Sequence, residues 1–251
     1  MPRFFVRQDQ ITDEIITVTG QDAFHISHSL RMSAGEHIIV CDMQRREYDC
    51  ILEEFDDDKV CARIYSVTES QNEPPCFITL FQALPKGDKL DTVIQKAVEC
   101  GVGRIVPFES ERCVVRMKPE AEAKKCERRN RISAEAAKQC GRSIIPEVAQ
   151  TVSFKEMTES AHESDYVFFC YEGDGTVPIG KLLNTMCIND GGLSGKKISV
   201  IIGSEGGFSL DEAETAIKSG FMMAGLGKRI LRTETASSFV LACIACITEL
   251  S

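Results

Sequence analysis

The chain has 251 residues, of which 43% are hydrophobic and 27% are charged, and its formal net charge at pH 7 is −9. This composition is that of an ordinary globular protein with one or two domains. The longest apolar run, residues 239–247, is far too short to span a membrane and predicts a buried helix. No charged segment followed by an apolar one opens the chain, so we expect a cytoplasmic rather than a secreted protein.

Cysteine and histidine indicate neither a disulfide framework nor a metal site. The twelve cysteines are scattered, and without a secretory leader they predict reduced thiols. His25 and His28 lie three residues apart, which places both on one face of any helix that forms there. A surface or nucleic-acid contact is favoured over metal ligation, and we expect no metal.

The charge is unevenly distributed along the chain. Residues 86–142 contain fourteen basic and nine acidic residues, a local net charge of +5, whereas the remainder carries −14. Within this window, residues 124–142 hold seven basic residues against Glu127 and Glu135. A basic stripe on an acidic protein is typical of a localised polyanion site, and a solvated helix face with mixed charges is an equally weighted alternative.

The first 70 residues predict a small β-barrel. Short segments rich in β-branched residues, several of them alternating in polarity, are typical of strands at this spacing. A helical insert is expected over residues 21–32, and the polar, proline-containing residues 71–75 predict a linker. The expected strands are Arg3–Val6, Ile15–Thr19, His37–Cys41, Glu47–Glu53 and Lys59–Thr68.

Beyond the linker, expected strands alternate with expected helices. Asp88 is expected to cap a helix whose apolar residues recur at helical spacing, and a long polar helix is expected from about residue 120 to 140. Such alternation predicts an α/β domain with a parallel sheet covered on both faces. The expected buried strands are Phe77–Leu84, Arg104–Phe108, Asp165–Cys170 and Ile198–Ile202.

The most informative motif is a glycine-rich segment, residues 203–207 (GSEGG), directly after a buried strand. Ser209 and Glu212 have capping-box spacing for the helix that follows. Glycines at the carboxyl end of a strand let backbone amides approach a ligand closely. The pattern is neither GxGxxG nor a P-loop, and Glu205 would repel a phosphate. A ligand without phosphate, bearing an amino acid or a nucleoside, is favoured; a tight turn without a ligand is the alternative.

A second motif precedes the C-terminal apolar helix. Residues 226–236 contain Lys228, Arg229 and Arg232 beside small and hydroxylated residues. Thr233 or Thr235 is expected to cap the helix, and the cations are suited to neutralise charge that develops on a substrate. An ordinary charged surface loop is the alternative.

Together the two motifs resemble the C-terminal signature of SPOUT methyltransferases, specifically the RsmE type that makes 3-methyluridine in 16S ribosomal RNA. Further segments match this family in the same order along nearly the whole chain. They are PRFF (2–5), HSLR (28–31), QALPKGDK (82–89), QKAVECGV (95–102), SERC (110–113) and EAAKQCGR (135–142). Ser204 stands where family members usually have proline, which alters loop stiffness and leaves the resemblance intact.

The resemblance implies a fold of class α/β with two domains. Residues 73–251 would form the SPOUT-type methyltransferase domain, whose chain end is tucked through a loop as a trefoil knot. Residues 1–72 would form a PUA-like β-barrel that binds RNA. The family is homodimeric, with its active site near the subunit interface. The acidic net charge is then no objection, because RNA would be met locally by the barrel and the basic helix.

The resemblance also implies that S-adenosyl-L-methionine binds among three loops, through backbone groups and apolar side chains. The expected cofactor-binding residues are Phe169, Cys170, Tyr171, Glu172, Gly203, Ser204, Glu205, Gly206, Gly207, Leu226, Gly227, Arg229, Ile230, Leu231, Thr235 and Ala236.

The implied reaction moves a methyl group from sulfur to N3 of a uridine in 16S ribosomal RNA of the small subunit. N3 carries a proton at physiological pH, so the enzyme must align N3 with the methyl group and favour loss of that proton. We expect Arg232 to stabilise the developing uridinate, whereas Glu205 is a weak candidate for the base. The expected RNA-contacting residues, each with a structural ion pair as the alternative, are Arg3, Arg7, Arg31, Lys86, Arg112, Arg129 and Arg142.

Three other functions compete at this point. The first is a SPOUT enzyme acting on a transfer RNA or another ribosomal site. The second is an RNA-binding or ribosome-assembly factor without catalysis, which the presence of Arg229, Arg232 and Glu234 around the glycine loop disfavours. The third is a nucleotide-dependent metabolic enzyme, which the lack of a phosphate-binding motif disfavours.

Overall fold

The computed structural model describes residues 1–56 and 58–250. The chain divides into two compact units, one of residues 1–73 and 137–145 and one of residues 74–136 and 146–251. The expected domain boundary between residues 72 and 73 stays a prediction.

The first unit is built on a five-stranded sheet in the order β1-β3-β4-β5-β2. β1 and β3 pair in parallel, and the remaining neighbours pair antiparallel, with Ile16 opposite Ala62. Alternate residues point into one core that includes Phe4, Ile38 and Leu52. The strands are β1 (Arg3–Phe5), β2 (Ile15–Thr19), β3 (His37–Cys41), β4 (Arg46–Phe55) and β5 (Lys59–Glu69), which confirms the five expected strands with small shifts at their ends.

The helical insert of this unit is shorter than expected. A 3-10 turn, η1 (Gln8–Gln10), precedes it, and the insert itself consists of α1 (Gly20–Phe24) followed by the π-helical segment η2 (His25–Ser29). Arg31 has a φ of 54°, which a right-handed helix does not allow. The helix therefore ends before residue 32.

The second unit contains an eight-stranded sheet in the order β11-β13-β10-β12-β6-β7-β8, with β9 beside β7. All its strand pairs are parallel, as predicted. Consecutive residues 198–202 of β12 are all buried, so both faces of the sheet are covered. The strands are β6 (Phe77–Ala83), β7 (Arg104–Glu109), β8 (Glu147–Val148), β9 (Val152–Ser153), β10 (Tyr166–Cys170), β11 (Val177–Pro178), β12 (Lys197–Ile202) and β13 (Met222–Gly225).

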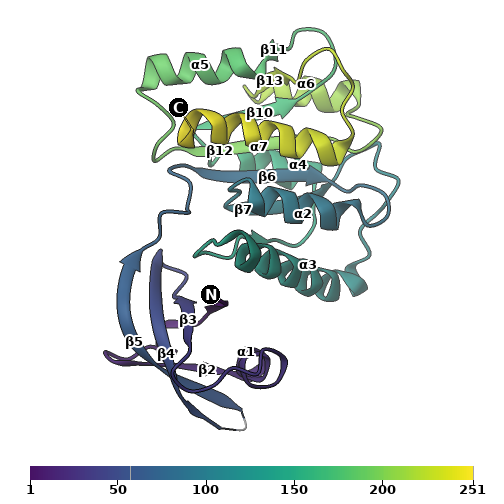
Figure 1. The fold of residues 1–251 in the computed structure, drawn as a ribbon. Helices are drawn as coiled ribbons and strands as arrows, with labels where there is room; N and C mark the ends of the chain where they lie inside the picture. The colour runs from purple at the N-terminus through teal and green to yellow at the C-terminus, as the bar shows by residue number, and fades with distance from the viewer. Residues whose placement is uncertain (57, 251) are drawn as a thin grey trace. The chain divides into compact units, whose positions relative to one another are not determined.

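Helices fill the connections between these strands. α2 and α7 pack against each other on the face of the sheet turned toward the viewer in Figure 1. The helices are α2 (Lys89–Glu99), α3 (Pro119–Cys140), α4 (Phe154–Ala161), α5 (Ile179–Asp190), α6 (Leu210–Lys218) and α7 (Thr233–Glu249).

Capping interactions are expected at the N-termini of three helices, and the structure shows each of these positions. Ser209 and Glu212 form the predicted capping box at α6. Asp88 occupies the N-cap position of α2, but its side chain makes no capping hydrogen bond, so that expectation is wrong. At α7 the N-cap is Arg232, and the structure corrects the expectation of a threonine cap, because the hydroxyl of Thr233 bonds to another loop.

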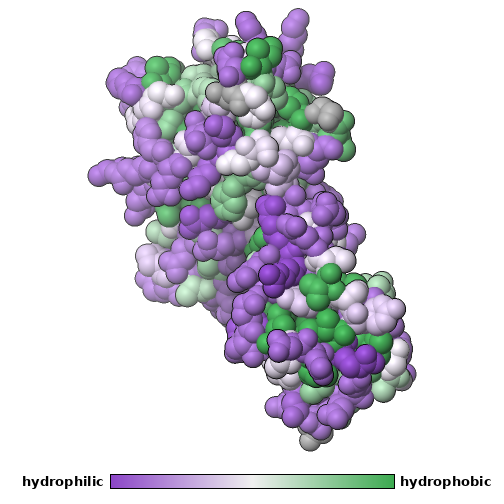
Figure 2. Space-filling model, turned by 90° about the vertical axis from the view of Figure 1, so that its left-hand side faces the viewer, coloured by the Kyte–Doolittle hydropathy of each residue, from purple (hydrophilic) through white to green (hydrophobic). Residues whose placement is uncertain are grey.

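No helix among residues 1–56 and 58–250 is long and apolar enough to span a bilayer. Hydrophilic side chains predominate on the face drawn in Figure 2, where hydrophobic ones form smaller groups. All twelve cysteines are free thiols. The described part of the chain holds no cluster of three or more His, Cys, Asp or Glu suited to a metal ion.

Candidate active site

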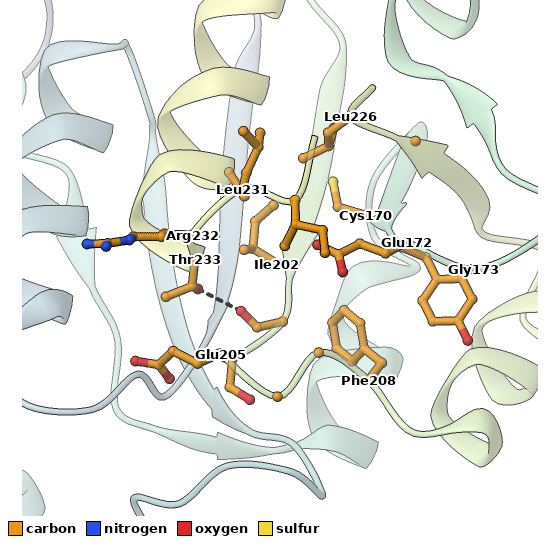
Figure 3. A pocket seen from close by; sticks show the side chains of 18 of the residues that line it. Cys170, Glu172, Gly173, Ile202, Glu205, Phe208, Leu226, Leu231, Arg232 and Thr233 are labelled. Carbon is orange, nitrogen blue, oxygen red and sulfur yellow. Dashed lines mark hydrogen bonds between the residues drawn. The ribbon is translucent and has the colours of Figure 1, made fainter. Parts of the chain in front are cut away.

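A cavity of about 680 Å³ opens in the second unit at the carboxyl ends of β10, β12 and β13. This is the edge at which open parallel sheets bind ligands, and the volume lies within the range of small-molecule sites. Figure 3 shows the cavity with Arg232, Thr233 and Glu205 toward one side and Cys170, Leu226 and Phe208 toward the other. Its lining comes from residues 170–173 and 176, residues 202–208 and 210, residues 225–233 and 236, and Arg112.

The structure brings together most of the expected cofactor-binding residues. Phe169 is fully buried beneath the lining, with its ring centroid 4.2 Å from that of Phe208. Thr235 is exposed on α7 and does not line the cavity. The residues that do line it are Cys170, Tyr171, Glu172, Gly203, Ser204, Glu205, Gly206, Gly207, Leu226, Gly227, Arg229, Ile230, Leu231 and Ala236.

Sequence reasoning missed several lining residues. Thr176 and Gly225 belong to or flank β11 and β13, which are too short to have been predicted. The apolar residues Ile202 and Phe208 flank the glycine loop and carry no motif of their own. The full set of missed residues is Gly173, Thr176, Ile202, Phe208, Leu210, Gly225 and Thr233.

The glycines of the loop at residues 203–207 have distinct structural reasons. Gly207 has a φ of 65°, a conformation that favours glycine, and its amide closes the turn on the carbonyl of Ser204 at 3.0 Å. A Cβ on Gly206 would lie 3.0 Å from the Cβ of Arg112, tighter than ordinary packing. Close packing therefore explains part of the motif, in addition to any ligand.

Hydrogen bonds at Gly203, Glu205 and Gly206 fix the position of this loop. The Thr233 hydroxyl donates to the carbonyl of Gly203 at 2.7 Å, and the Arg112 guanidinium donates to the carbonyl of Gly206 at 3.1 Å. The Glu205 carboxylate accepts from the Lys86 amide at 3.1 Å and from the Lys89 ammonium at 2.8 Å. The loop is thus anchored from the segments that follow β6 and β7 and from the start of α7.

Glu205 is poorly suited to remove a proton. Partial burial raises its pKa, but hydrogen bonds from Lys89 and from backbone amides outweigh that effect and hold the pKa below its ordinary value. An ionised carboxylate already engaged by these donors is a weak base. These contacts favour an anchoring role in the loop, and the expectation of Glu205 as a weak candidate for the base stays a prediction.

The cations of the second motif, unlike the Glu205 carboxylate, are not held in ion pairs with the described residues. Lys228, Arg229 and Arg232 are exposed, and no ion pair is formed by any of them within the described ranges. Arg232 extends from the start of α7 toward the side of the cavity where Glu205 lies (Figure 3). Their charges are therefore available to a substrate or cofactor.

Two further groups define the chemistry of the lining. Burial raises the pKa of the Cys170 thiol to about 12, so this cysteine stays protonated and is not a nucleophile. The hydroxyl oxygen of Ser204 is buried and has no hydrogen-bond partner among the residues described. A buried hydroxyl in that state has hydrogen-bonding capacity left for a bound ligand or water.

The expected RNA-contacting residues divide into two groups. Arg7, Arg31, Lys86 and Arg112 are exposed. Arg3, Arg129 and Arg142 have side chains only 13%, 6% and 5% exposed, in ion pairs with Glu47, Glu122 and Glu73 respectively. The buried ion pairs of Arg129 and Arg142 and the partly buried pair of Arg3 favour the alternative of a structural role over a phosphate contact.

Other basic residues of the stripe on α3 also form ion pairs. Arg128 pairs with Asp91, Arg131 with Glu127 and Lys138 with Asp22. The mixed-charge alternative is therefore favoured for most of the stripe.

The comparisons with known proteins agree with this geometry. Residues 72–245 match the family model of the RNA methyltransferase domain, and residues 18–65 match that of the RNA methyltransferase PUA domain. The fold and its cavity thus define the class as RNA methyltransferases with an attached PUA domain.

Similarity to individual proteins identifies the family within this class. The chain is 33% identical to ribosomal RNA small subunit methyltransferase E of Bacillus subtilis (strain 168), covering 100% of this chain and 98% of that protein. It is 31% identical to the protein of that name from Mesomycoplasma hyopneumoniae, covering 96% and 97%. The crystal structure of the Neisseria gonorrhoeae protein of that name, bound to S-adenosyl methionine, superposes with a TM-score of 0.83 at 29% identity, covering 98% and 97%. The chain belongs to the ribosomal RNA small subunit methyltransferase E family.

Proposed function

We propose that this protein transfers a methyl group from S-adenosyl-L-methionine to N3 of a uridine in 16S ribosomal RNA of the small subunit, forming 3-methyluridine. The observation that carries the proposal is the cavity, in which the two sequence motifs of the family meet at the carboxyl edge of the parallel sheet. A neighbour of the same fold over nearly its full length is bound to S-adenosyl methionine.

The lining suits this cofactor. Backbone amides and carbonyls of residues 203–207 and 226–231 would hold the amino acid and adenine edges, and Ile202, Leu226 and Leu231 would pack on the ring. The buried Ser204 hydroxyl would add a hydrogen bond that proline could not supply. A sulfonium cation tolerates Glu205 nearby, as a phosphate would not. Phe169 would support this site from below, and Thr235 is left out of it.

Arg232 would stabilise the substrate charge. As N3 loses its proton, negative charge develops on the uracil carbonyl oxygens, and an exposed guanidinium that forms no ion pair with the described residues can donate to them. Since Glu205 is anchored to Lys89, the proton would leave to water, with Arg232 favouring the uridinate. Alignment of N3 with the methyl group then supplies the remaining acceleration.

Exposed cations would position the RNA. We propose Arg7, Arg31, Lys86 and Arg112 as phosphate contacts, with little base specificity of their own. Lys228 joins them, because it is exposed at the cavity.

The wider architecture is proposed from the family resemblance. It comprises a PUA-like barrel of residues 1–72, a SPOUT domain of residues 73–251 with a trefoil knot, a homodimer and a cytoplasmic location. Support for a dimer comes from apolar side chains that are exposed in the second unit, namely Ile188 (82%), Ile230 (85%) and Phe239 (38%).

The test uses small ribosomal subunits from a bacterial strain that lacks the corresponding methyltransferase. The subunits are incubated with the protein and methyl-labelled S-adenosyl-L-methionine, and the nucleosides are identified by mass after digestion. We expect label in 3-methyluridine. Label in another nucleoside, or cofactor binding without transfer to these subunits, would point to a different RNA target, and absence of cofactor binding would overturn the proposal.

A further inference from the structure

A buried hydrogen-bond relay joins three segments beneath the cavity. Gln82, at the carboxyl end of β6, is fully buried, and its side-chain amide donates to the Thr233 hydroxyl at 2.8 Å, to the Ala83 carbonyl at 3.0 Å and, at 3.5 Å, to the Gly203 carbonyl. The Thr233 hydroxyl in turn donates to the carbonyl of Gly203 at 2.7 Å, the contact dashed in Figure 3. A hydroxyl has one hydrogen to give, so accepting from Gln82 orients it toward Gly203.

The relay connects the two halves of the site. Gly203 opens the glycine-rich loop, and Thr233 directly follows Arg232 at the start of α7. The Arg232 carbonyl accepts from the amides of Thr235 and Ala236, so the backbone of Arg232 is fixed to the same helical turn. The position of Gly203 relative to Thr233 therefore sets the position of the loop relative to Arg232.

We infer that Gln82 and Thr233 are positioning residues that hold Arg232 in register with the glycine-rich loop. This inference rests on the proposed function, in which the loop holds the cofactor and Arg232 holds the uridinate. Neither residue needs to touch the reacting atoms. Methyl transfer requires in-line alignment, and a misplacement of about 1 Å costs roughly 100-fold in rate. Loss of the Thr233 hydroxyl would also leave the Gly203 carbonyl without this donor in a buried environment.

The chain offers a matched control one turn further along α7. Ser237 is as buried as Thr233, but among the described residues its hydroxyl bonds only to the carbonyls of Thr233 and Glu234 within its own helix. Removing either hydroxyl takes one buried hydrogen-bonding group from the same helix. Only the change at Thr233 breaks a contact with the glycine-rich loop.

The experiment compares Thr233→Val, Thr233→Ser and Ser237→Ala with the natural protein. In the ligand-free protein, amide hydrogen exchange over residues 204–207 should accelerate at least about tenfold in Thr233→Val, because the loop loses a buried anchor. At saturating cofactor the same variant should lose about ten- to 100-fold in kcat. Thr233→Ser keeps the hydroxyl and should restore both values to within roughly threefold, and Ser237→Ala should leave both unchanged.

Gln82→Met is a second variant that removes the amide donor without altering α7, and it keeps the inference testable if Thr233→Val does not fold. It should move loop exchange and kcat in the same direction as Thr233→Val. The inference would be overturned if Thr233→Val kept the loop exchange and the kcat of the natural protein, as Ser237→Ala should. It would also be overturned if Thr233→Ser lost as much of both as Thr233→Val. If the natural protein makes no 3-methyluridine, the proposed function fails separately, and the exchange data alone decide whether the relay positions the loop.

Discussion

Arg129 of α3 and Arg142 just after it differ from the basic residues of the loop before α7 in what their charges contact. Arg129 and Arg142 are buried against Glu122 and Glu73, whereas Lys228 and Arg232 are exposed and form no ion pair within the described residues. By number, α3 holds more basic residues, six in Pro119–Cys140 against three in residues 226–232. The difference teaches that burial in an ion pair, rather than the number of basic residues nearby, separates structural cations from cations available to a ligand.

The buried pair of Arg142 with Glu73 shows why such a charge is not available to RNA. The Glu73 carboxylate accepts from the Arg142 guanidinium at 2.7 Å and from the amides of Ser143 and Ile144 at 2.9 and 3.1 Å. A guanidinium is tolerated in a buried site only when a carboxylate and further hydrogen bonds compensate for its lost hydration. Such a pair fixes the segment after α3 to residue 73 and leaves no charge for RNA.

The largest effect that would test this comparison is on stability. Arg142→Ala should lower the free energy of unfolding by about 3–5 kcal/mol, because it leaves the Glu73 carboxylate buried without its partner. Urea unfolding followed by circular dichroism measures the change. Arg131→Ala, which removes an exposed pair on α3, is the control and should unfold as the natural protein does. Unchanged stability with weakened RNA binding would contradict the structural role of Arg142.

The next largest effect concerns Arg232, which forms no ion pair within the described residues. Arg232→Ala should reduce kcat by roughly 100- to 1,000-fold, since it removes the proposed donor to the developing uridinate. The dissociation constant of the cofactor, measured by calorimetry, should change by less than about threefold because this interaction forms only in the transition state. Lys218→Ala, which removes an exposed cation outside the cavity lining, is the control and should keep kcat. Full activity of Arg232→Ala would refute the proposed role.

Exposed cations should act through RNA affinity. In Lys86→Ala/Arg112→Ala, the slope of log affinity against log salt concentration should fall by roughly 1.4–1.8, the value for two lost phosphate contacts. The backbone amide of Lys86 keeps its bond to Glu205 in this variant, whereas the bond from the Arg112 guanidinium to the Gly206 carbonyl is lost. Lys155→Ala/Lys218→Ala has the same charge change in two exposed pairs and should keep the slope. Equal slopes for both double variants would remove Lys86 and Arg112 from the RNA-binding surface.

Much of the fold could be predicted because its strands carry strong local patterns. β2 and β3 were expected with the bounds they have, and the glycine-rich loop was expected at the end of a buried parallel strand. The strands that were missed, β8, β9, β11 and β13, have two to four residues each. Segments this short are defined by their pairing partners in space, and no periodicity in the sequence signals them.

The candidate site was predictable in its residues and less so in their roles. Motif likeness identified the loops, yet Glu205 was considered as a base although Lys89, 116 positions away, holds its carboxylate. Arg129 and Arg142 were expected to contact RNA because their carboxylate partners could not be known from sequence spacing. Gln82 and Thr233 are separated by 151 positions, and only the folded chain shows that they meet.

The smallest expected effect is at the paired carboxylate of the site itself. Glu205→Gln keeps the shape of the side chain and weakens the contact with Lys89, so kcat should fall by less than about tenfold, whereas removal of a true general base costs roughly 100- to 10,000-fold.

Because the pKa of Glu205 is held below its reference value of 4.5, the ion pair is complete above pH 4.5 and is lost only as the pH falls through the lowered pKa. The rate at neutral pH and above should therefore show no titration of Glu205. It should instead rise with pH in the natural protein and in Glu205→Gln alike, because the fraction of uridinate rises. A kcat–pH profile that is flat at neutral pH and above in the natural protein, and rises with pH only in Glu205→Gln, would return Glu205 to the role of base, because only the variant would then depend on the free uridinate.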